Sequence, residues 1–373
     1  MRHRRSTAAL VGGASILALA LTGCGPSPAV SGSAGADGSA YDAFAEMSAD
    51  ERAAAIVAAA EEEGEVVVYL RSDDVFGEIE AAFEAEYDLD LVILNPGTTQ
   101  VVQQQIFEQA AAGRIEADVV ETYSHELNLM YAEEGVVAPI PAFLAESAPD
   151  RDLVSDHAIE TFQYPFLPVW NVDAVTGADV PTSIRDFGEP FWAGRTALVT
   201  NYHPWYLTIF QELTQNQGMS VAEFEELMTT IAAHSSTADS SNPASAGIAS
   251  GQYYGGPNIA LVAPQRLTGA PVSYEPTIDP VPLVPAGIGL MREAPHPAAA
   301  LLFSTWYLNE GATILAAEQY VQQNAAETDL LEAAKVRPDL TDLTSERLNE
   351  WRIAYDNLLK GTEPILPDYV RGG

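Results

Sequence analysis

The sequence predicts an α/β protein of two lobes, each with a parallel-rich sheet, joined by a crossover hinge. Three observations support this fold class. Short apolar segments alternate along the chain with segments of helical periodicity, a pattern typical of parallel strands connected by right-handed crossovers. The apolar segments are continuous, as in strands that helices cover on both faces. The chain has 373 residues, which exceeds the length at which one hydrophobic core usually keeps growing, so we expect two lobes.

The N-terminal segment has the features of an export signal. Residues 1–5 are basic, and residues 8–21 form an apolar run that is long enough for a signal-peptide core and short for a membrane span. The run leads to Leu-Thr-Gly-Cys, which ends at Cys24 and resembles the bacterial lipobox, whose cysteine is lipidated. We therefore predict a lipoprotein signal peptide over residues 1–23, lipidation of Cys24 and a flexible tether over residues 24–40. The expected location is the cell membrane, with a lipid anchor on the extracytoplasmic face.

The composition limits the classes of function. The chain has 17 Lys and Arg against 53 Asp and Glu, a formal net charge of -36, and a protein of this charge repels nucleic acid. We interpret the excess of acid as a solvated surface that aids solubility. Cys24 is the only cysteine, so the chain has no internal disulfide and, once Cys24 is lipidated, no thiol nucleophile. The sequence also lacks the His-Glu-x-x-His, phosphate-loop and Gly-x-Ser-x-Gly motifs, and we expect no enzymatic activity.

The first lobe begins with a helix that has a clear start and a clear end. Ser48 and Glu51 have the spacing of a capping box, and Gly64 marks the last turn. Three strands and three helices then alternate. The expected strands are residues 65–70, 89–94 and 117–120, and the expected helices are residues 48–63, 75–87, 100–112 and a last helix that ends at Gly135.

Polar residues follow each of these strands. The carboxyl ends of parallel strands lie along one edge of the sheet, where open α/β folds bind their ligands. Ser72 and Asp73 can touch a ligand there or cap the next helix. At Thr98 and Thr99, the N–H groups that start the following helix are free for an anion or a polar ligand. The candidate ligand-binding residues of this lobe are Arg71, Ser72, Asp73, Thr98, Thr99, Thr122 and Tyr123.

The second lobe repeats the strand and helix pattern. A strand over residues 196–200 leads to Tyr202 and His203, which we add to the candidate ligand-binding residues. Trp170 is another candidate, and it either packs at the hinge or touches the ligand. The further elements that we expect are helices over residues 206–216, 224–233, 297–308 and 345–359 and a strand over residues 258–263.

Two segments are expected to cross between the lobes. Residues 280–285 are rich in proline and valine, as in an extended segment, and a second crossing is expected between residues 141 and 169. The predicted division is residues 41–140 and 281–335 for lobe 1, 173–280 for lobe 2, 141–172 for the hinge and crossover region, and 336–373 for C-terminal helices packing on the lobes.

Several stretches resemble one protein family in the family's own order. The first three are Glu-Glu-Glu-Gly-Glu-Val-Val-Val-Tyr (61–69), Ala-Asp-Val-Val (117–120) and Tyr-Ala-Glu-Glu-Gly-Val-Val-Ala-Pro (131–139). The later three are Trp-Asn-Val-Asp (170–173), Pro-Phe-Trp-Ala-Gly-Arg (190–195) and Ala-Pro-His-Pro (294–297). From about residue 47 to residue 323, the chain thus resembles the iron-type extracellular solute-binding proteins of ABC importers.

This resemblance implies a fold, a function and partners. The fold is the type II periplasmic-binding-protein fold, and the function is capture of a small-molecule or metal solute by hinge closure. The captured solute is delivered to the permease and ATPase subunits of an ABC importer. We expect a monomer with no cofactor, although ferric iron stays open as the cargo.

The ferric members of that family resemble one another in their metal ligands. They have a histidine in the first loop, where this chain has Asp73, and a carboxylate in the third loop, where it has Tyr123, with Glu121 two residues earlier. Their Tyr-Tyr pair follows a strand of the second lobe, whereas Tyr253 and Tyr254 precede the expected strand. The resemblance therefore implies an organic or anionic solute in preference to ferric iron. If iron is the cargo, the ligand set is Asp73, Glu121, Tyr253 and Tyr254.

The remaining histidines and two other functions complete these expectations. We expect His125 and His234 to be solvated, and His296, which lies between two prolines, to be structural. An extracytoplasmic hydrolase that uses Asp73 or His203 stays open as an alternative. So does a solute sensor that serves no transporter.

Overall fold

The computed structural model describes residues 40–71, 75–95, 97–265, 267–317, 321–322 and 335–371. The predicted signal peptide, residues 24–39 of the predicted tether with Cys24, and the candidates Ser72 and Asp73 lie outside these residues. Within the described part of the chain, no helix has the length and apolar character needed to cross a membrane.

The strands form one continuous path of hydrogen-bonded neighbours in the order β2-β1-β3-β9-β4-β7-β5-β6, with β8 and β10 pairing with β4 and β11 pairing with β9. β1 is parallel to β2 and β3, and β5 is parallel to β6 and β7. The strands are β1 (Glu65–Tyr69), β2 (Asp90–Leu94), β3 (Val119–Tyr123), β4 (Ile159–Asn171), β5 (Thr196–Val199), β6 (Ser235–Ala238), β7 (Gly255–Ala260), β8 (Val272–Ser273), β9 (Val281–Leu290), β10 (Val321–Gln322) and β11 (Lys335–Val336).

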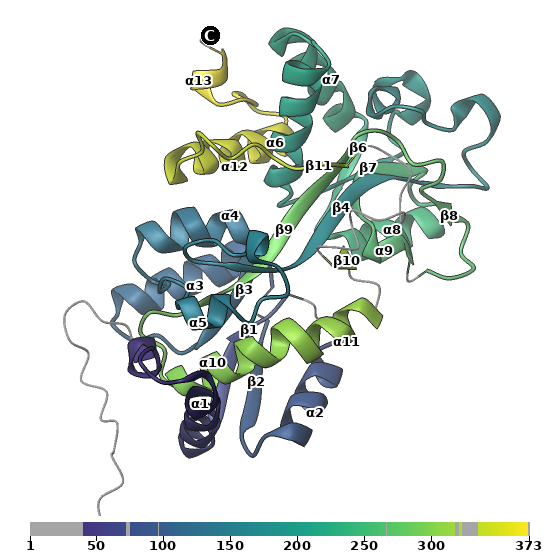
Figure 1. Cartoon of the computed structure of the whole chain (residues 1–373). Helices are drawn as coiled ribbons and strands as arrows, with labels where there is room; N and C mark the ends of the chain where they lie inside the picture. Colours follow the sequence, from purple (N-terminus) through teal and green to yellow (C-terminus); the bar gives the residue numbers. More distant parts are fainter. Residues whose placement is uncertain are drawn as a thin grey trace, which may run out of the picture.

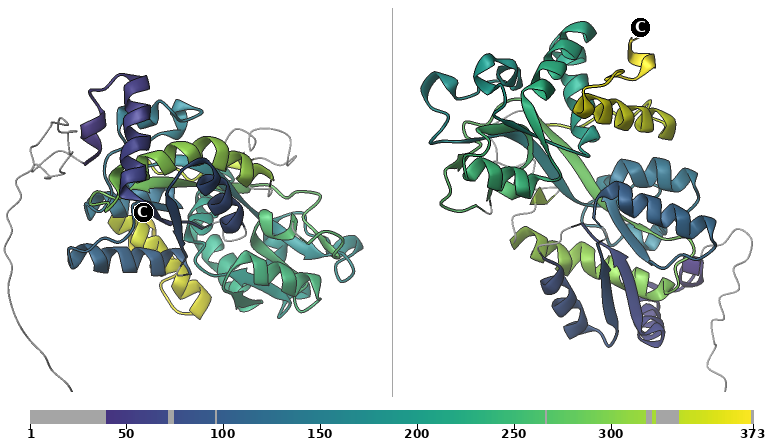
Figure 2. Two further views of the ribbon diagram at one scale, coloured as in Figure 1. Left: turned by 90° about the horizontal axis from the view of Figure 1, so that it is seen from below. Right: turned by 180° about the vertical axis from the view of Figure 1, so that it is seen from behind.

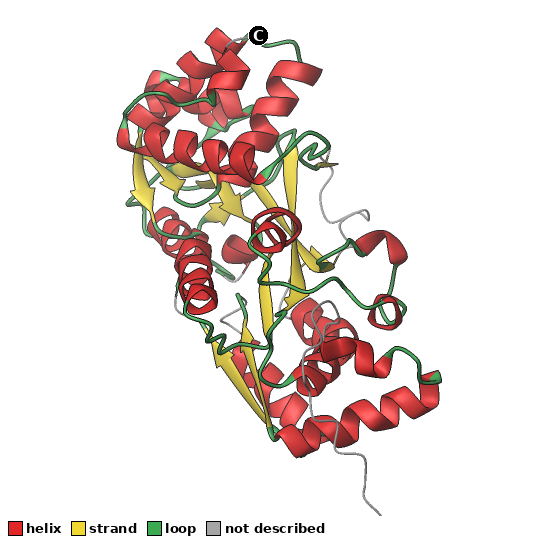
Figure 3. Ribbon diagram, turned by 90° about the vertical axis from the view of Figure 1, so that its left-hand side faces the viewer, coloured by secondary structure: helices red, strands yellow, loops and turns green. Residues whose placement is uncertain are grey.

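Helices cover the strands on both sides (Figure 3). In chain order, the first seven α-helices are α1 (Ala49–Glu63), α2 (Phe76–Glu86), α3 (Thr99–Ala111), α4 (Ser124–Glu126), α5 (Ala142–Ala145), α6 (His203–Gln211) and α7 (Val221–Ala233). The α-helices that follow are α8 (Ser241–Ala249), α9 (Val262–Gln265), α10 (Pro297–Trp306), α11 (Ala312–Ala317), α12 (Ser345–Lys360) and α13 (Asp368–Arg371). The predicted α/β fold is confirmed.

Two long antiparallel strands, β4 and β9, connect the two lobes (Figure 1). The C-terminal half of β9 pairs with β3 of the first lobe, where Ala286 lies opposite Tyr123. The C-terminal half of β4 pairs with β7 of the second lobe, where Trp170 lies opposite Gly255. Each lobe is therefore joined to the other by two strands that pair with each other at the crossing.

The first lobe has a core between its strands and the helices α1, α2 and α10. Phe83 of α2 packs edge-on against Phe303 and Trp306 of α10, with ring centroids 5.5 and 5.2 Å apart. The predicted capping box of Ser48 and Glu51 is present, and Gly64 ends α1 with φ 82°, a left-handed conformation that favours glycine. Local sequence signals thus place the first helix correctly.

The second lobe has an aromatic core to which the C-terminal helix contributes. Tyr206 and Phe210 of α6 pack against Trp351 of α12, with ring centroids 5.7 and 5.1 Å apart. The hydroxyl of Tyr206 also donates a hydrogen bond to the carbonyl of Ile365 at 2.8 Å. α12 belongs to the second lobe but lies beside α3 and α4 of the first lobe (Figures 1 and 2).

Several elements differ in their bounds from the sequence prediction, among them β3, which spans Val119–Tyr123, and α7, which starts at Val221. The expected strand 258–263 is β7, which starts three residues earlier, at Gly255. The strand has glycines at these positions because the neighbouring backbone is very close. A Cβ added to Gly255 would lie 2.8 Å from the carbonyl oxygen of Val169, and one added to Gly256 would lie 2.7 Å from that of Ala197. The expected helix 206–216 begins at residue 203, since a proline is tolerated in a first helical turn. The helix that ends at Gly135 starts as α4 and continues as a π-helical turn, η3 (Leu127–Tyr131).

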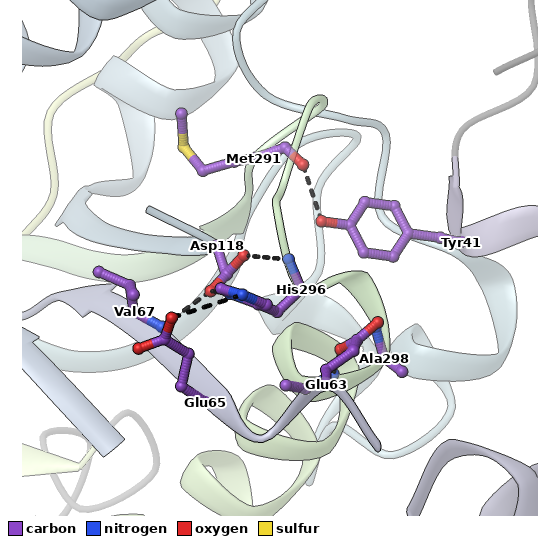
Figure 4. Close-up of polar contacts among 9 residues, drawn as sticks. Tyr41, Glu63, Glu65, Val67, Asp118, Met291, His296 and Ala298 are labelled. Carbon is purple, nitrogen blue, oxygen red and sulfur yellow. Dashed lines mark hydrogen bonds and ion pairs between the residues drawn. The ribbon is translucent and has the colours of Figure 1, made fainter. Parts of the chain in front are cut away.

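A buried polar network ties β1, β3 and α10 together (Figure 4). The carboxylate of Asp118 accepts hydrogen bonds from the backbone N–H groups of Val67 at 2.8 Å and His296 at 2.7 Å, and it contacts Nδ1 of His296 at 3.0 Å. Glu63 accepts hydrogen bonds from Ala298 and Ala299, two backbone N–H groups at the start of α10. His296 is structural, as the sequence predicted.

Candidate functional site

A cavity of about 490 Å³ lies at the carboxyl ends of the strands. Its lining comes mainly from the last residues of β3 and from the loops after β1, β2, β5 and β6, so both lobes contribute. The lining includes six of the candidate residues, namely Arg71, Thr98, Thr99, Thr122, Tyr123 and Tyr202. It also includes residues for which the sequence gave no candidate, among them Tyr164, Asn201, Asp239, Ser240, Ser241 and Asn242.

Arg71 is the one basic side chain among the described residues that line this cavity. Its guanidinium carbon lies 4.5 Å from the ring centroid of Tyr123 and 5.6 Å from that of Tyr164. Nη1 donates a hydrogen bond to the hydroxyl of Thr99, while Nε is buried and has no hydrogen-bond partner in the described part of the chain. The guanidinium is thus held on two aromatic faces with an N–H group left for an anionic partner.

Glu121 holds the backbone of Arg71 in place. Its buried carboxylate accepts hydrogen bonds from the backbone N–H of Arg71 at 3.1 Å, the hydroxyl of Tyr307 at 2.8 Å and the hydroxyl of Thr161 at 3.3 Å. Burial raises the pKa of Glu121, against the opposing effect of these hydrogen bonds. The carboxylate is therefore engaged by structural contacts.

The wall from the second lobe is built around Tyr202. Asn201 has φ 62°, a left-handed conformation that asparagine adopts more readily than most residues, and the turn it makes precedes Tyr202. The hydroxyl of Tyr202 lies 3.0 Å from that of Ser241, which accepts a hydrogen bond from the N–H of Ala260 at 2.8 Å. The ring of Tyr202 packs on Phe166 with centroids 4.5 Å apart. These contacts fix the orientation of Tyr202.

Three helices begin at the cavity: α3, α6 and α8. Their N-cap residues are Thr98, Tyr202 and Ser240, all of which line the cavity, and none of them caps its helix with a side-chain hydrogen bond. Backbone N–H groups of the first turn are therefore available, and the helix dipole adds partial positive charge there. The arrangement suits an anionic group. The third of these helix starts was not predicted from the sequence. The sequence signal for it is the polar run from Asp239 to Asn242, directly after β6.

Several candidate residues lie outside the cavity. Trp170 is buried in the core of the second lobe, where it pairs with Ser273 of β8, and His203 is buried as well. Tyr253 and Tyr254 precede β7, at the opposite end of the strand from Ala260, which lines the cavity. The structure therefore does not bring the two tyrosines together with Glu121.

The expectation that His125 is solvated was wrong. His125 is buried because the helix that carries it faces the second lobe, and burial lowers its pKa to about 4. His234 is half-buried, with Nδ1 3.1 Å from the carbonyl oxygen of Phe187. A helical pattern predicts which face turns inward within one lobe, but it does not show which residues the other lobe covers.

Comparisons with known proteins agree with this architecture. Among curated proteins, no relative matches the chain. Among solved structures, iron-bound HitA from Pseudomonas aeruginosa is similar at 17% identity, covering 80% of this chain and 98% of its own, with a TM-score of 0.61. The spermidine/putrescine-binding protein PotD from Streptococcus pneumoniae is 13% identical over 80% of this chain and 98% of its own, with a TM-score of 0.58.

A third similar structure is AfuA from Actinobacillus pleuropneumoniae with fructose-6-phosphate bound, which is 15% identical over 80% of this chain and 97% of its own, with a TM-score of 0.57. These likenesses show the fold, which is that of the type II periplasmic binding proteins. The family model of the bacterial extracellular solute-binding proteins matches residues 75–314, more than half of the chain. The chain therefore belongs to the bacterial extracellular solute-binding proteins.

Proposed function

We propose that this protein is a lipid-anchored solute-binding protein that captures a small organic solute with an anionic group and delivers it to the permease and ATPase of an ABC importer. The observation that carries the proposal is the position of Arg71 in a cavity at which three helices begin. A guanidinium with a free N–H and several uncapped helix starts match a phosphate, phosphonate or carboxylate group.

Ferric iron fits this cavity less well. The cation of Arg71 lies over the ring of Tyr123 and opposes a second cation at that wall. Glu121 already accepts three hydrogen bonds, and Tyr253 and Tyr254 lie at the far end of β7. Among the similar structures are an iron-bound protein, a polyamine-binding protein and a protein with a bound sugar phosphate. The third of these ligand classes matches the chemistry of this cavity.

The mechanism is closure of the two lobes around the solute. Arg71 and Thr99 line the cavity from the first lobe, and Tyr202 and Ser241 line it from the second. A ligand that touches both walls binds the closed form better and shifts the population towards it. β4 and β9 connect the lobes and are the strands about which they close. An affinity near 1 μM corresponds to about -8 kcal/mol, which a few charged and polar contacts in a closed cavity supply.

A ligand screen tests the nature of the solute. The purified protein is heated in the presence of a sugar phosphate, a phosphonate, a dicarboxylate, spermidine or ferric citrate, and Tm is measured. At 100 times its Kd, a ligand of the native state stabilises the protein by about 2.7 kcal/mol. We expect this stabilisation with an anionic organic solute. Stabilisation by spermidine alone, or by ferric citrate with a tyrosinate colour, contradicts the proposal.

The lipid anchor has a separate test. If Cys24 carries the lipid, Cys24→Ala removes the anchor, because the attached chains bury methylene groups in the bilayer at about 0.8 kcal/mol each. We expect the variant in the soluble fraction of lysed or fractionated cells and the wild-type protein in the membrane fraction. Equal retention of both proteins in the membrane contradicts the anchor, and it leaves the proposal for the solute unaffected.

A further inference from the structure

A buried cluster of two histidines and one glutamate lies outside the solute cavity. His125 and Glu126 belong to α4, which follows β3 of the first lobe, and His203 is the first residue of α6 in the second lobe. One potential ligand atom from each residue lies within 4.8 Å of the others, and the three residues are 5%, 4% and 2% exposed. None of them lines the cavity.

Most of the ring nitrogens in this cluster have no hydrogen-bond partner in the described structure. Both ring nitrogens of His125 and Nδ1 of His203 are buried without a hydrogen bond in the described structure. Nε2 of His203 lies 3.9 Å from a carboxylate oxygen of Glu126, whose other oxygen accepts a hydrogen bond from Thr122 at 2.6 Å. Buried polar groups nearly always have a partner, because a group left without one loses its hydrogen bonds to water and gains none in the protein. Two buried imidazole rings in one place, each with at least one nitrogen lacking a partner, call for a common partner.

We propose that His125, Glu126 and His203 bind one divalent transition-metal ion of the zinc class, and that this ion links the two lobes. Two imidazoles and one carboxylate are a ligand set that zinc accepts in proteins, with water in the fourth position. Bonds of about 2.0 to 2.2 Å require the ligand atoms to approach one another by roughly 1 Å from their present spacing. Rotation of the side chains or a small further closure of the lobes achieves this.

The surrounding charges select the kind of metal. The positive charges of Arg71, in the first lobe, and Arg352, on α12, both interact electrostatically with Glu126 and His203. Nη1 of Arg352 lies 3.5 Å from Oε1 of Gln103. Both cations oppose the entry of a metal ion. Ca²⁺ and Mg²⁺ need several oxygen ligands to offset such repulsion, and this cluster supplies one carboxylate. Imidazole nitrogens instead favour zinc, copper or nickel.

The position of the cluster gives the ion a route in and a role. His125 and His203 come from different lobes, so opening of the lobes separates them and exposes the site. Closure then brings the three ligands together. A bound ion stabilises the closed form by the difference between its affinities for the closed and open forms. The metal and the solute therefore act on the same opening and closing motion from separate sites.

The test is zinc binding by protein freed of metal with a chelator, with no solute present. We expect one equivalent of Zn²⁺ per chain by equilibrium dialysis, and a tetrahedral visible spectrum when Co²⁺ replaces it. His125→Ala and His203→Ala should each weaken Zn²⁺ binding by at least tenfold, while His234→Ala, a half-buried histidine outside the cluster, should not. Circular dichroism checks that each variant is folded.

Two further measurements separate this site from the solute cavity. Small-angle X-ray scattering should show that Zn²⁺ compacts the wild-type protein, and that it does not compact the His203→Ala variant. Arg71→Ala removes a cation from the surroundings of the cluster, so it should leave Zn²⁺ binding intact or strengthen it. The proposal is overturned if no Zn²⁺ binds stoichiometrically, if both histidine variants bind it as the wild-type protein does, or if Arg71→Ala abolishes binding.

Discussion

Arg71→Ala should weaken binding of the anionic solute by about 10- to 100-fold, because a hydrogen bond to a charged group contributes about 1.5 to 3 kcal/mol. Its guanidinium lies over Tyr123 and Tyr164 and is the one basic group in the described lining of the cavity. No other side chain there replaces its charge. Isothermal titration calorimetry with the solute identified by the Tm screen measures the change directly.

Arg195 offers a matched control. Its guanidinium lies 5.2 Å from the ring centroid of Phe191 and 4.9 Å from that of Tyr254, an arrangement much like that of Arg71, but Arg195 does not line the cavity. Arg195→Ala should therefore leave the affinity unchanged. Arg71→Lys should recover only part of it, since an ammonium group keeps the charge and loses the planar fork. Equal affinity in Arg71→Ala and the wild-type protein would show that the anion binds elsewhere.

Asp118→Ala should destabilise the protein by about 3 to 5 kcal/mol, the largest stability effect that we expect from one substitution. The carboxylate is fully buried and accepts hydrogen bonds from Val67 and His296, so its loss leaves two backbone N–H groups without partners in the core of the first lobe. These contacts join β1, β3 and the start of α10 (Figure 4). Urea unfolding with and without the substitution measures the change in free energy of unfolding.

Glu65→Gln is the control for this effect, because Glu65 contacts the same histidine from outside. Its carboxylate lies 3.7 Å from Nε2 of His296, with the side chain 49% exposed. Exposed ion pairs contribute about 0 to 1 kcal/mol, so this variant should stay close to the wild-type protein. A loss as large as that of Asp118→Ala would show that the charge of His296, and not the buried hydrogen bonds, holds the network together.

The same network predicts a dependence on pH. Burial raises the pKa of Asp118 above its unfolded value, and its hydrogen bonds to Val67 and His296 only partly offset this. The part of the stability that depends on protonation of Asp118 is therefore fully present below the unfolded pKa of about 3.9 and is lost as pH rises through the folded pKa. Asp118→Asn does not titrate at this position. Its destabilisation relative to the wild-type protein should be larger at pH 4 than at pH 7.

The strands and the residues at their ends show which features sequence patterns can predict and which they cannot. Continuous apolar runs predicted β1 and β2, and polar residues after the strands predicted that Arg71, Thr99 and Tyr202 would lie in one cavity. This succeeded because parallel strands place their carboxyl ends along one edge, whatever the details of packing. The predicted start of β7 was three residues too late because the strand begins with glycines. Strand propensities disfavour glycine, but the close approach of neighbouring backbone requires it here.

By itself, the sequence determined the alternation of strands and helices, the start and end of α1, and the edge of the sheets at which the cavity lies. These features follow from hydrophobic periodicity and capping, which act between residues close together in the chain. Only the tertiary structure decided that His125 is buried beside His203, and that Tyr254 lies at the far end of its strand from the cavity. The physical reason is that burial and contact across the two lobes depend on how β4 and β9 bring distant segments together, and no local pattern records that.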